Sequence, residues 1–329
     1  MTGWRAELDL RGAGKQSGAI YFGETAVPIT VVANGNGPTV VLTAGVHGDE
    51  YEGQITLSEL ARQLSPGDVA GRLIIAPTLN APACLAGQRL CPIDHLNLNR
   101  AFPGDTAGTF TQQLAAFVET ILYDEVDYAV DIHGGGAILH FHSATLLVVT
   151  EDAAANQRRL DLATAFGART CMLFGAHTMG VDVGIDGAML RRNVIGIAGE
   201  FGGSAQVGAE SLTLVRTGIR HVLARLGVIA GPSATTWPTT PVLVDVRPAR
   251  CYVTAPRAGV FEPLATLGDT VHRNDVLGLL HQPTRIDTHP TPLLAGTDGI
   301  VMAMRTPART EPGDWMFIIG EPVAEMILE

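Results

Sequence analysis

Residues 40–50 have the sequence Val-Val-Leu-Thr-Ala-Gly-Val-His-Gly-Asp-Glu. The apolar start of this stretch predicts a short buried strand, and Gly45 marks the turn that ends it. His47 and Glu50 follow within that turn, three positions apart. Imidazole nitrogens and carboxylate oxygens both bind zinc, so this pair is a candidate for part of a metal site. Such a pair on its own also arises by chance.

A second strand-and-turn pattern occurs downstream, where Val130-Asp131-Ile132-His133 leads into three glycines. Two imidazoles and one carboxylate suit zinc and leave a coordination position for water. We therefore expect His47, Glu50 and His133 to hold one Zn²⁺ per chain. Asp131 would lie on the same side of its strand as His133 and accept a hydrogen bond from a ligand histidine. A strand-end aspartate bonded to the backbone is the alternative.

Strands alternate with helices between residues 40 and 226, which predicts an α/β fold. We expect a mixed, mostly parallel sheet flanked by helices. In such sheets ligands bind beyond the carboxyl ends of the strands, where the candidate ligands fall. The predicted strands cover residues 40–44, 73–76, 128–132, 146–149 and 194–198, and the predicted helices cover 50–64, 111–123, 152–166 and 206–226.

Further candidates come from a long irregular loop, predicted from residue 78 to about 108, and from a later strand end. Arg89, Asn99 and Arg100 lie in the loop, and an arginine there can bind a carboxylate or stabilise an oxyanion. Each arginine alone would more often be a surface charge. Glu200 lies among glycines after an apolar strand, which favours a general base and acid over a solvent-facing loop residue.

Composition narrows the class of protein. The chain has 329 residues, 46% of them hydrophobic, and a net charge of −11. This acidity argues against binding to nucleic acid or to an anionic membrane. Four scattered cysteines and the lack of an apolar leader predict a cytoplasmic protein with reduced thiols. The mean hydropathy of +0.22 mildly favours self-association into a homo-oligomer.

The pattern changes near residue 235, where we place a boundary between a catalytic domain (1–235) and a C-terminal domain (236–329). Short β-prone runs separated by Gly, Pro and Asp predict that the second domain is all-β. It resembles the barrel-sandwich fold of biotinyl and lipoyl carrier domains. A carrier needs a lysine for its prosthetic group, and the single lysine of the chain is Lys15, so we exclude a carrier role.

The order of five short motifs carries a family resemblance. The motifs are G-x-H-G-x-E from Gly45, N-x₆-G-x-R from Asn80, L-N-R-x-F-P-G from Leu98, D-x-H-G from Asp131 and G-E-F-G-G from Gly199. This order resembles the succinylglutamate desuccinylase/aspartoacylase family, which belongs with the zinc carboxypeptidases. The resemblance runs from about residue 38 to 230, and the β-rich tail also fits it. One departure is Asn97, which stands where the family often has aspartate.

The resemblance implies a role for each candidate. It implies zinc ligands at His47, Glu50 and His133, a general base and acid at Glu200, a carbonyl-polarising group at Arg89, and substrate-carboxylate binding at Asn99 and Arg100. The implied activity is removal of an acyl group from a small N-acyl amino acid, with N-acetyl-diaminobutyrate as one candidate substrate. A zinc carboxypeptidase acting on peptides and a non-catalytic binding protein are the alternatives. A C-terminal domain packed over the zinc cleft would favour small substrates.

Overall fold

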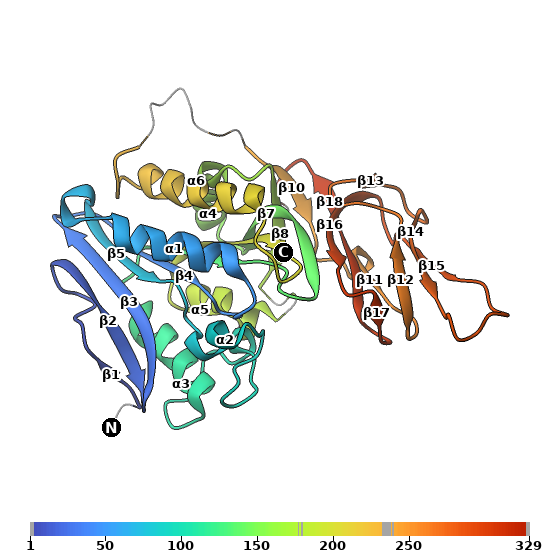
Figure 1. Cartoon of the computed structure of the whole chain (residues 1–329). Coiled ribbons are helices and arrows are strands. Elements are labelled where there is room, and N and C mark those ends of the chain that lie inside the picture. The colour runs from blue at the N-terminus through green and yellow to red at the C-terminus, as the bar shows by residue number, and fades with distance from the viewer. Residues whose placement is uncertain (1–2, 177, 179, 232–237, 239, 327–329) are drawn as a thin grey trace.

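The computed structural model describes residues 3–176, 178, 180–231, 238 and 240–326 (Figure 1). A mixed sheet of 14 strands runs through the molecule in the order β1-β2-β3-β5-β4-β6-β9-β7-β8-β10-β18-β16-β13, with β11 beside β18. The bounds of these strands are β1 Arg5–Ala6, β2 Gly14–Phe22, β3 Thr25–Asn34, β4 Thr39–Ala44, β5 Gly71–Ala76, β6 Tyr128–His133, β7 Leu139–Val149, β8 Thr170–Gly175, β9 Ile195–Gly203, β10 Val242–Asp245, β11 Tyr252–Thr254, β13 Thr270–Val271, β16 Gly299–Arg305 and β18 Trp315–Val323.

Parallel pairing is confined to the middle of this sheet. Strands β5, β4, β6 and β9 are parallel neighbours, and so are β7, β8 and β10. Antiparallel pairs join β9 to β7 and extend the sheet at both ends. The predicted mixed α/β fold is confirmed. The expectation that the sheet is mostly parallel holds only for its central strands. Parallel neighbours in a sheet need long crossover connections. Strands β2 and β3 are instead joined by a tight turn, and the C-terminal strands follow one another without α-helices, which favours antiparallel pairing.

Helices cover both faces of the central strands (Figure 1). One face carries α1 (Tyr51–Gln63), α4 (Ala153–Phe166) and α6 (Ala209–Arg225). The opposite face carries α3 (Phe110–Phe117) and α5 (Ile185–Arg191), with the short α2 (Ala81–Ala86) nearby. The 3₁₀ turns are η1 (Pro66–Asp68), η2 (Leu98–Arg100), η4 (Val181–Val183) and η6 (Ala249–Cys251), and the π-helix η3 (Val118–Leu122) continues α3.

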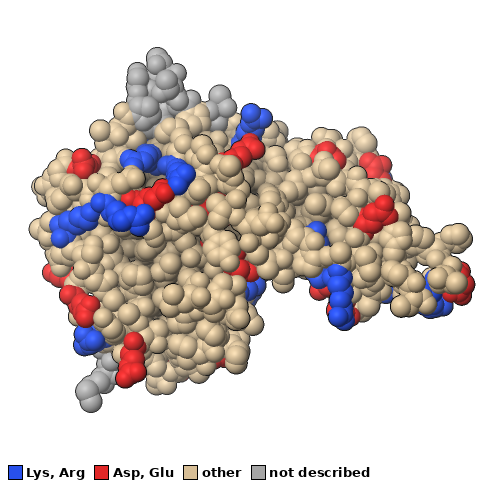
Figure 2. All heavy atoms as spheres, viewed as in Figure 1, with Lys and Arg blue, Asp and Glu red and all other residues tan. Residues whose placement is uncertain are grey.

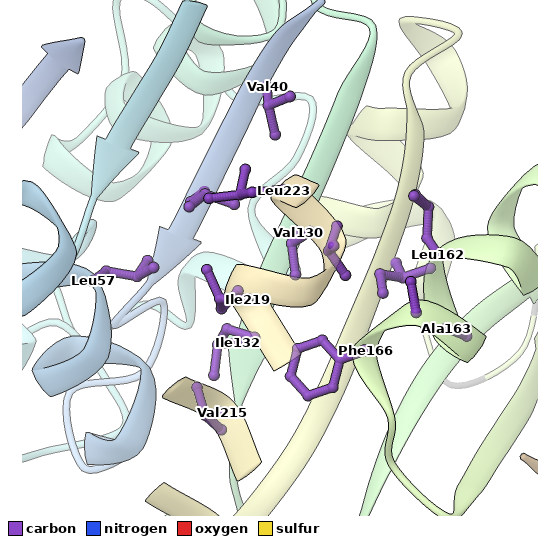
Figure 3. Packing of buried hydrophobic residues seen from close by; sticks show 14 of the residues in the cluster. Val40, Leu57, Val130, Ile132, Leu162, Ala163, Phe166, Val215, Ile219 and Leu223 are labelled. Atoms are coloured by element: carbon purple, nitrogen blue, oxygen red, sulfur yellow. The ribbon is translucent and has the colours of Figure 1, made fainter. Parts of the chain in front are cut away.

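The core beneath the first set of helices is built mainly from aliphatic side chains, together with the rings of Phe166 and Phe201, and Figure 3 shows part of it. Leu57 of α1, Ile219 of α6 and Phe166 of α4 lie over Val130 and Ile132 of β6, and all five are at most 2% exposed. Burial of each such side chain contributes about 1.5–3 kcal/mol. This packing fixes the position of β6, and with it the position of His133, the last residue of that strand.

The C-terminal region is rich in strands and joins the main sheet directly. Strands β10, β18 and β16 extend that sheet, and β16 also pairs with β7. A second sheet of four strands, in the order β15-β14-β12-β17, covers a small separate core. Its bounds are β12 Gly259–Pro263, β14 Val276–His281, β15 Thr291–Leu294 and β17 Arg309–Thr310. The barrel-sandwich type stays a prediction, and the predicted boundary near residue 235 lies outside the described residues.

Two expectations about local structure were wrong, and two elements were not predicted. The loop after residue 78 is not irregular throughout, because it contains α2 and η2. Strand β9 continues to Gly203, so Glu200 lies within a strand and not beyond its end. Strand β8 and helix α5 were not predicted, since α5 is short and begins after a glycine-flanked turn.

The surface carries interspersed charges of both signs on the face that Figure 2 presents. Among the described residues, ion pairs such as Arg216–Glu59 and Arg250–Glu321 join side chains of opposite charge. Among the helices of the described residues, none combines the length and the apolar character needed to cross a lipid bilayer.

Candidate metal centre

The turn after β4 is held in shape by close packing against α2. Gly45 has a φ of +68°, and a Cβ there would lie 2.6 Å from the Sγ atom of Cys84. A Cβ on Gly48 would lie 1.9 Å from the carbonyl oxygen of Ala83. Only glycine fits at these two places, and the resulting tight turn brings His47 and Glu50 back over the end of the sheet.

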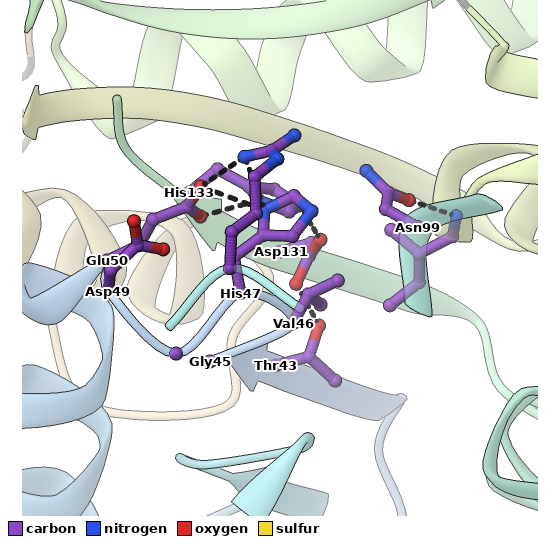
Figure 4. A network of polar contacts seen from close by, with 12 residues as sticks. Thr43, Gly45, Val46, His47, Asp49, Glu50, Asn99, Asp131 and His133 are labelled. Atoms are coloured by element: carbon purple, nitrogen blue, oxygen red, sulfur yellow. Dashed lines mark hydrogen bonds and ion pairs between the residues drawn. The ribbon is translucent and has the colours of Figure 1, made fainter. Parts of the chain in front are cut away.

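His47, Glu50 and His133 meet in one buried cluster (Figure 4). Each residue offers one ligand atom, and these atoms lie within 4.8 Å of one another. The Nδ1 atom of His47 is 2.8 Å from Oε1 of Glu50, and the Nδ1 atom of His133 is 2.8 Å from Oε2 of the same carboxylate. The sequence prediction that these three residues come together is therefore met by the geometry.

Each imidazole is oriented by a partner on its other nitrogen. Nε2 of His47 lies 3.0 Å from Oδ1 of Asn97, and Nε2 of His133 lies 2.6 Å from Oδ2 of Asp131. Asp131 in turn accepts a hydrogen bond of 2.6 Å from Thr43. When Nε2 carries the proton, the lone pair of Nδ1 faces the other ligand atoms. The geometry therefore favours Asp131 as the hydrogen-bond partner of a ligand histidine over an aspartate bonded to the backbone.

The electrostatics of the cluster suit a bound cation. Burial opposes the ionisation of Glu50, but the charges of His47 and His133 and their hydrogen bonds outweigh it and lower the pKa of Glu50. Burial lowers the pKa of His47, whereas Asp131 and Glu50 overcome burial at His133 and raise its pKa. A buried carboxylate shared by two imidazoles is a donor set that fits zinc, which takes two histidines and one carboxylate in many catalytic sites.

Glu200 is placed beside the cluster by the register of the sheet. In the parallel pair β6–β9, Glu200 is directly opposite His133. Side chains alternate along a strand, so Phe201 faces the other way and stacks on Phe166 at 5.0 Å between ring centroids. A Cβ on Gly199 would lie 2.4 Å from the ring of Phe201, so a larger residue would disturb this arrangement.

Glu200 has an unusual environment for a carboxyl group. Its Oε2 atom is buried and has no hydrogen-bond partner among the described residues. Burial raises the pKa of Glu200 to about 8; His133 and Arg89 oppose this shift and the charge of Glu50 adds to it. A carboxyl group with a pKa near neutrality can both accept and donate a proton at physiological pH.

The three loop candidates line the same cavity, which has a volume of about 350 Å³. The guanidinium of Arg89 lies 3.3 Å from both Oε1 of Glu50 and Nδ1 of His47. The side-chain oxygen of Asn99 accepts a hydrogen bond of 2.8 Å from the N–H of Ile185 (Figure 4). Arg100 lies against Gly180, where a Cβ would be 3.0 Å from its Nε atom. The hydrogen bond from Ile185 to Asn99 anchors the start of α5, because Ile185 is the first residue of that helix.

Several cavity residues were not singled out from the sequence. Asp186 comes from the unpredicted helix α5, and Arg305, Asp314, Trp315 and Ile318 come from the C-terminal region. No local motif marks them, because the packing of distant segments brings them to the cavity. The C-terminal strands thus form part of the cavity wall.

Comparison with known proteins agrees with this geometry. The family model for the succinylglutamate desuccinylase/aspartoacylase catalytic domain matches residues 36–226. The N-alpha-acetyl-L-2,4-diaminobutyric acid deacetylase of Halomonas elongata is 36% identical over 306 residues, which cover 93% of this chain and 88% of the relative.

Solved structures match over nearly the whole length. A succinylglutamate desuccinylase/aspartoacylase from Rhodobacter sphaeroides has a TM-score of 0.90 and 36% identity, covering 98% of this chain and 100% of its own. The product-bound ectoine utilization protein EutE (DoeB) from Ruegeria pomeroyi has a TM-score of 0.91 and 32% identity, covering 98% of this chain and 99% of its own. The chain belongs to the succinylglutamate desuccinylase/aspartoacylase family of deacylating hydrolases.

Proposed function

We propose that the protein is a zinc-dependent deacylase that hydrolyses the amide bond of a small N-acyl amino acid. The observation that carries this proposal is the convergence of His47, Glu50 and His133 beside Glu200 in one cavity. His47, Glu50 and His133 would bind the zinc, with one ion per chain. When bound in such a set, zinc supplies a Lewis acid that polarises a carbonyl and lowers the pKa of water toward neutrality.

The protein's own residues would share the remaining work. The carboxylate of Glu200 takes a proton from the attacking water while the hydroxyl group adds to the carbonyl carbon. Glu200 then passes that proton to the amide nitrogen as the C–N bond breaks, which yields a carboxylic acid and a free amine. Arg89 stabilises the negative charge that develops on the carbonyl oxygen. Arg100 and the amide of Asn99 hold the carboxylate of the amino acid.

The shape of the site favours a small substrate over a peptide. Trp315, Ile318 and Arg305 place the C-terminal region in the wall of a cavity of about 350 Å³, a volume suited to a small molecule. The deacetylase of Halomonas elongata makes N-α-acetyl-L-2,4-diaminobutyrate the first substrate to test. We further propose a catalytic unit of residues 1–235 with a C-terminal all-β unit, acting in the cytoplasm.

The test is release of carboxylate from a panel of N-acyl amino acids by the zinc-loaded protein, with a panel of peptides alongside. Glu200→Gln should keep its zinc and lose at least about 100-fold in kcat. Glu210→Gln, an exposed change on α6, is the matched control and should retain full rate.

Each alternative has its own outcome. Cleavage of peptides but not of N-acyl amino acids would identify a carboxypeptidase. Zinc binding without cleavage of any amide would identify a binding protein. An undiminished rate in Glu200→Gln would remove Glu200 from the mechanism.

A further inference from the structure

Asp186 is a carboxylate on the cavity wall that the proposed mechanism does not use. It is the second residue of α5 and is partly buried. No other side chain among the described residues forms a hydrogen bond or an ion pair with it. Burial raises the pKa of Asp186 to about 6; the charge of Asp131 adds to this effect, and the charges of His133 and Arg159 oppose it. A half-buried carboxylate that forms no ion pair or hydrogen bond with a cationic side chain is costly, so a ligand cation would stabilise it.

Apart from Glu200, which the proposed mechanism uses, the other acidic groups on the cavity wall already have partners. Glu50 is shared by the two histidines, and Asp49 accepts a hydrogen bond of 2.8 Å from the N–H of Ala137. Asp314 forms an ion pair of 2.8 Å with Arg305. Asp186 therefore differs from these groups, because within the described part of the chain it forms no direct ion pair or side-chain hydrogen bond, and His133 and Arg159 act on its charge only from a distance.

The position of Asp186 places it next to the groups proposed to hold the substrate carboxylate. The N–H of Ile185, its neighbour in the chain, donates to Asn99, and Gly180 of the same segment packs against Arg100. Arg100, a positive group, and Asp186, a negative group, thus both line the cavity, and both contact or belong to the segment 180–186. Met172 and Val181, which also line the cavity, supply an apolar surface there. Low polarity around a carboxylate strengthens its attraction for a cation.

We propose that Asp186 binds a positively charged side chain of the substrate, and so selects N-acyl amino acids that carry a side-chain ammonium group. This inference rests on the proposed function and narrows its substrate class. An amino acid of this kind presents its α-carboxylate to Arg100 and its side-chain ammonium group to Asp186. These two contacts together hold the substrate while Glu200 acts on the amide.

A role for Asp186 at the start of α5 is the competing explanation. An acidic residue in the first turn of a helix interacts favourably with the helix dipole. Loss of that interaction would weaken the helix and affect every substrate alike. Selective loss of one substrate therefore separates the two explanations.

The experiment compares two substrates that differ only in charge, N-α-acetyl-L-2,4-diaminobutyrate and N-acetyl-L-norvaline, with the zinc-loaded full chain. We expect Asp186→Asn to lower kcat/KM for the cationic substrate by at least about tenfold, and that for norvaline by less than about threefold. Asp182→Asn removes the same charge from the exposed neighbouring turn and should leave both values within about threefold of wild type. An unchanged ratio of the two substrates in Asp186→Asn would overturn the inference.

A binding measurement keeps the outcome independent of turnover. Calorimetric titration of metal-free protein with free L-2,4-diaminobutyrate and with L-norvaline should show that Asp186→Asn weakens only the first, by at least about tenfold. If wild type cleaves no N-acyl amino acid, the proposed function is wrong, and this titration alone decides whether Asp186 holds a cationic amino acid. Equal affinities of wild type and Asp186→Asn for diaminobutyrate would then refute the assignment.

Discussion

At the scale of single residues, the orientation of two imidazoles decides what the cluster can bind. His47 and His133 both turn Nδ1 toward Glu50, because Asn97 and Asp131 engage their Nε2 atoms. The two partners differ in charge, so His133 has an anionic partner and His47 a neutral one. Glu200 lies beside them with a buried oxygen that has no hydrogen-bond partner in the described part of the chain.

The raised pKa of Glu200 predicts a pH-dependent stability. The pKa rises from the ordinary 4.5 to about 8 on folding, so the folded protein binds the proton more tightly than the unfolded chain. The stabilisation by this proton is complete below pH 4.5 and is lost as the pH rises toward 8. The side chain of Glu200→Gln does not titrate, so this variant does not lose stability in this way as the pH rises. In metal-free protein, the Tm of Glu200→Gln minus that of wild type should therefore increase by more than about 2 °C between pH 5 and pH 8.5. A constant difference across that range would show that Glu200 is not held protonated.

At the scale of elements, the turn after β4 carries two of the three proposed zinc ligands, His47 and Glu50. Its glycines are required by contacts with α2, which itself lies in a segment predicted to be irregular. The turn has almost no room to change, since Gly48 is in contact with the backbone of Ala83.

A methyl group at Gly48 should displace this turn. Its Cβ would lie 1.9 Å from a carbonyl oxygen, so the backbone must move. We expect Gly48→Ala to destabilise the protein by about 1–3 kcal/mol and to weaken zinc binding at least about tenfold. Gly67→Ala is the control, because no atom lies within 4 Å of the added Cβ. Equilibrium unfolding and zinc titration measure both effects, and identical results for the two variants would contradict this account of the turn.

The sequence predicted those features that depend on local pattern. Apolar runs located β4 and β6; His47 lies in the turn after β4, and His133 is the last residue of β6. Asp186 could not be found in this way, since its element is only one or two turns long and its position depends on packing against β9. The end of β9 was misplaced because Gly199 and Gly202 suggested a turn, whereas the pairing with β6 and β7 continues the strand past Glu200.

At the scale of the whole molecule, the C-terminal region completes both the sheet and the cavity. Strand β16 pairs with β7, with Ala303 opposite Phe141. Met302, Ala303 and Ile318 are buried in one core with Leu146 of the larger region. A unit that shares its sheet and its core with its neighbour contributes to the stability of that neighbour.

Removal of the C-terminal region should therefore abolish folding of the remainder. A chain of residues 1–235 would expose the edge of β8 and the apolar residues around Leu146, and an exposed apolar edge promotes aggregation. We expect this fragment to be insoluble or to unfold without cooperativity by calorimetry. A soluble fragment with a sharp transition and full deacylase activity would show instead that the catalytic unit is autonomous.

The central claim is that His47, Glu50 and His133 hold a single zinc ion, and metal content is its most direct test. Full-length protein dialysed against buffered zinc should contain about one zinc per chain by plasma emission spectroscopy, and His133→Ala should contain less than about 0.1 with an unchanged circular dichroism spectrum. Full zinc occupancy in a folded His133→Ala protein would contradict the account.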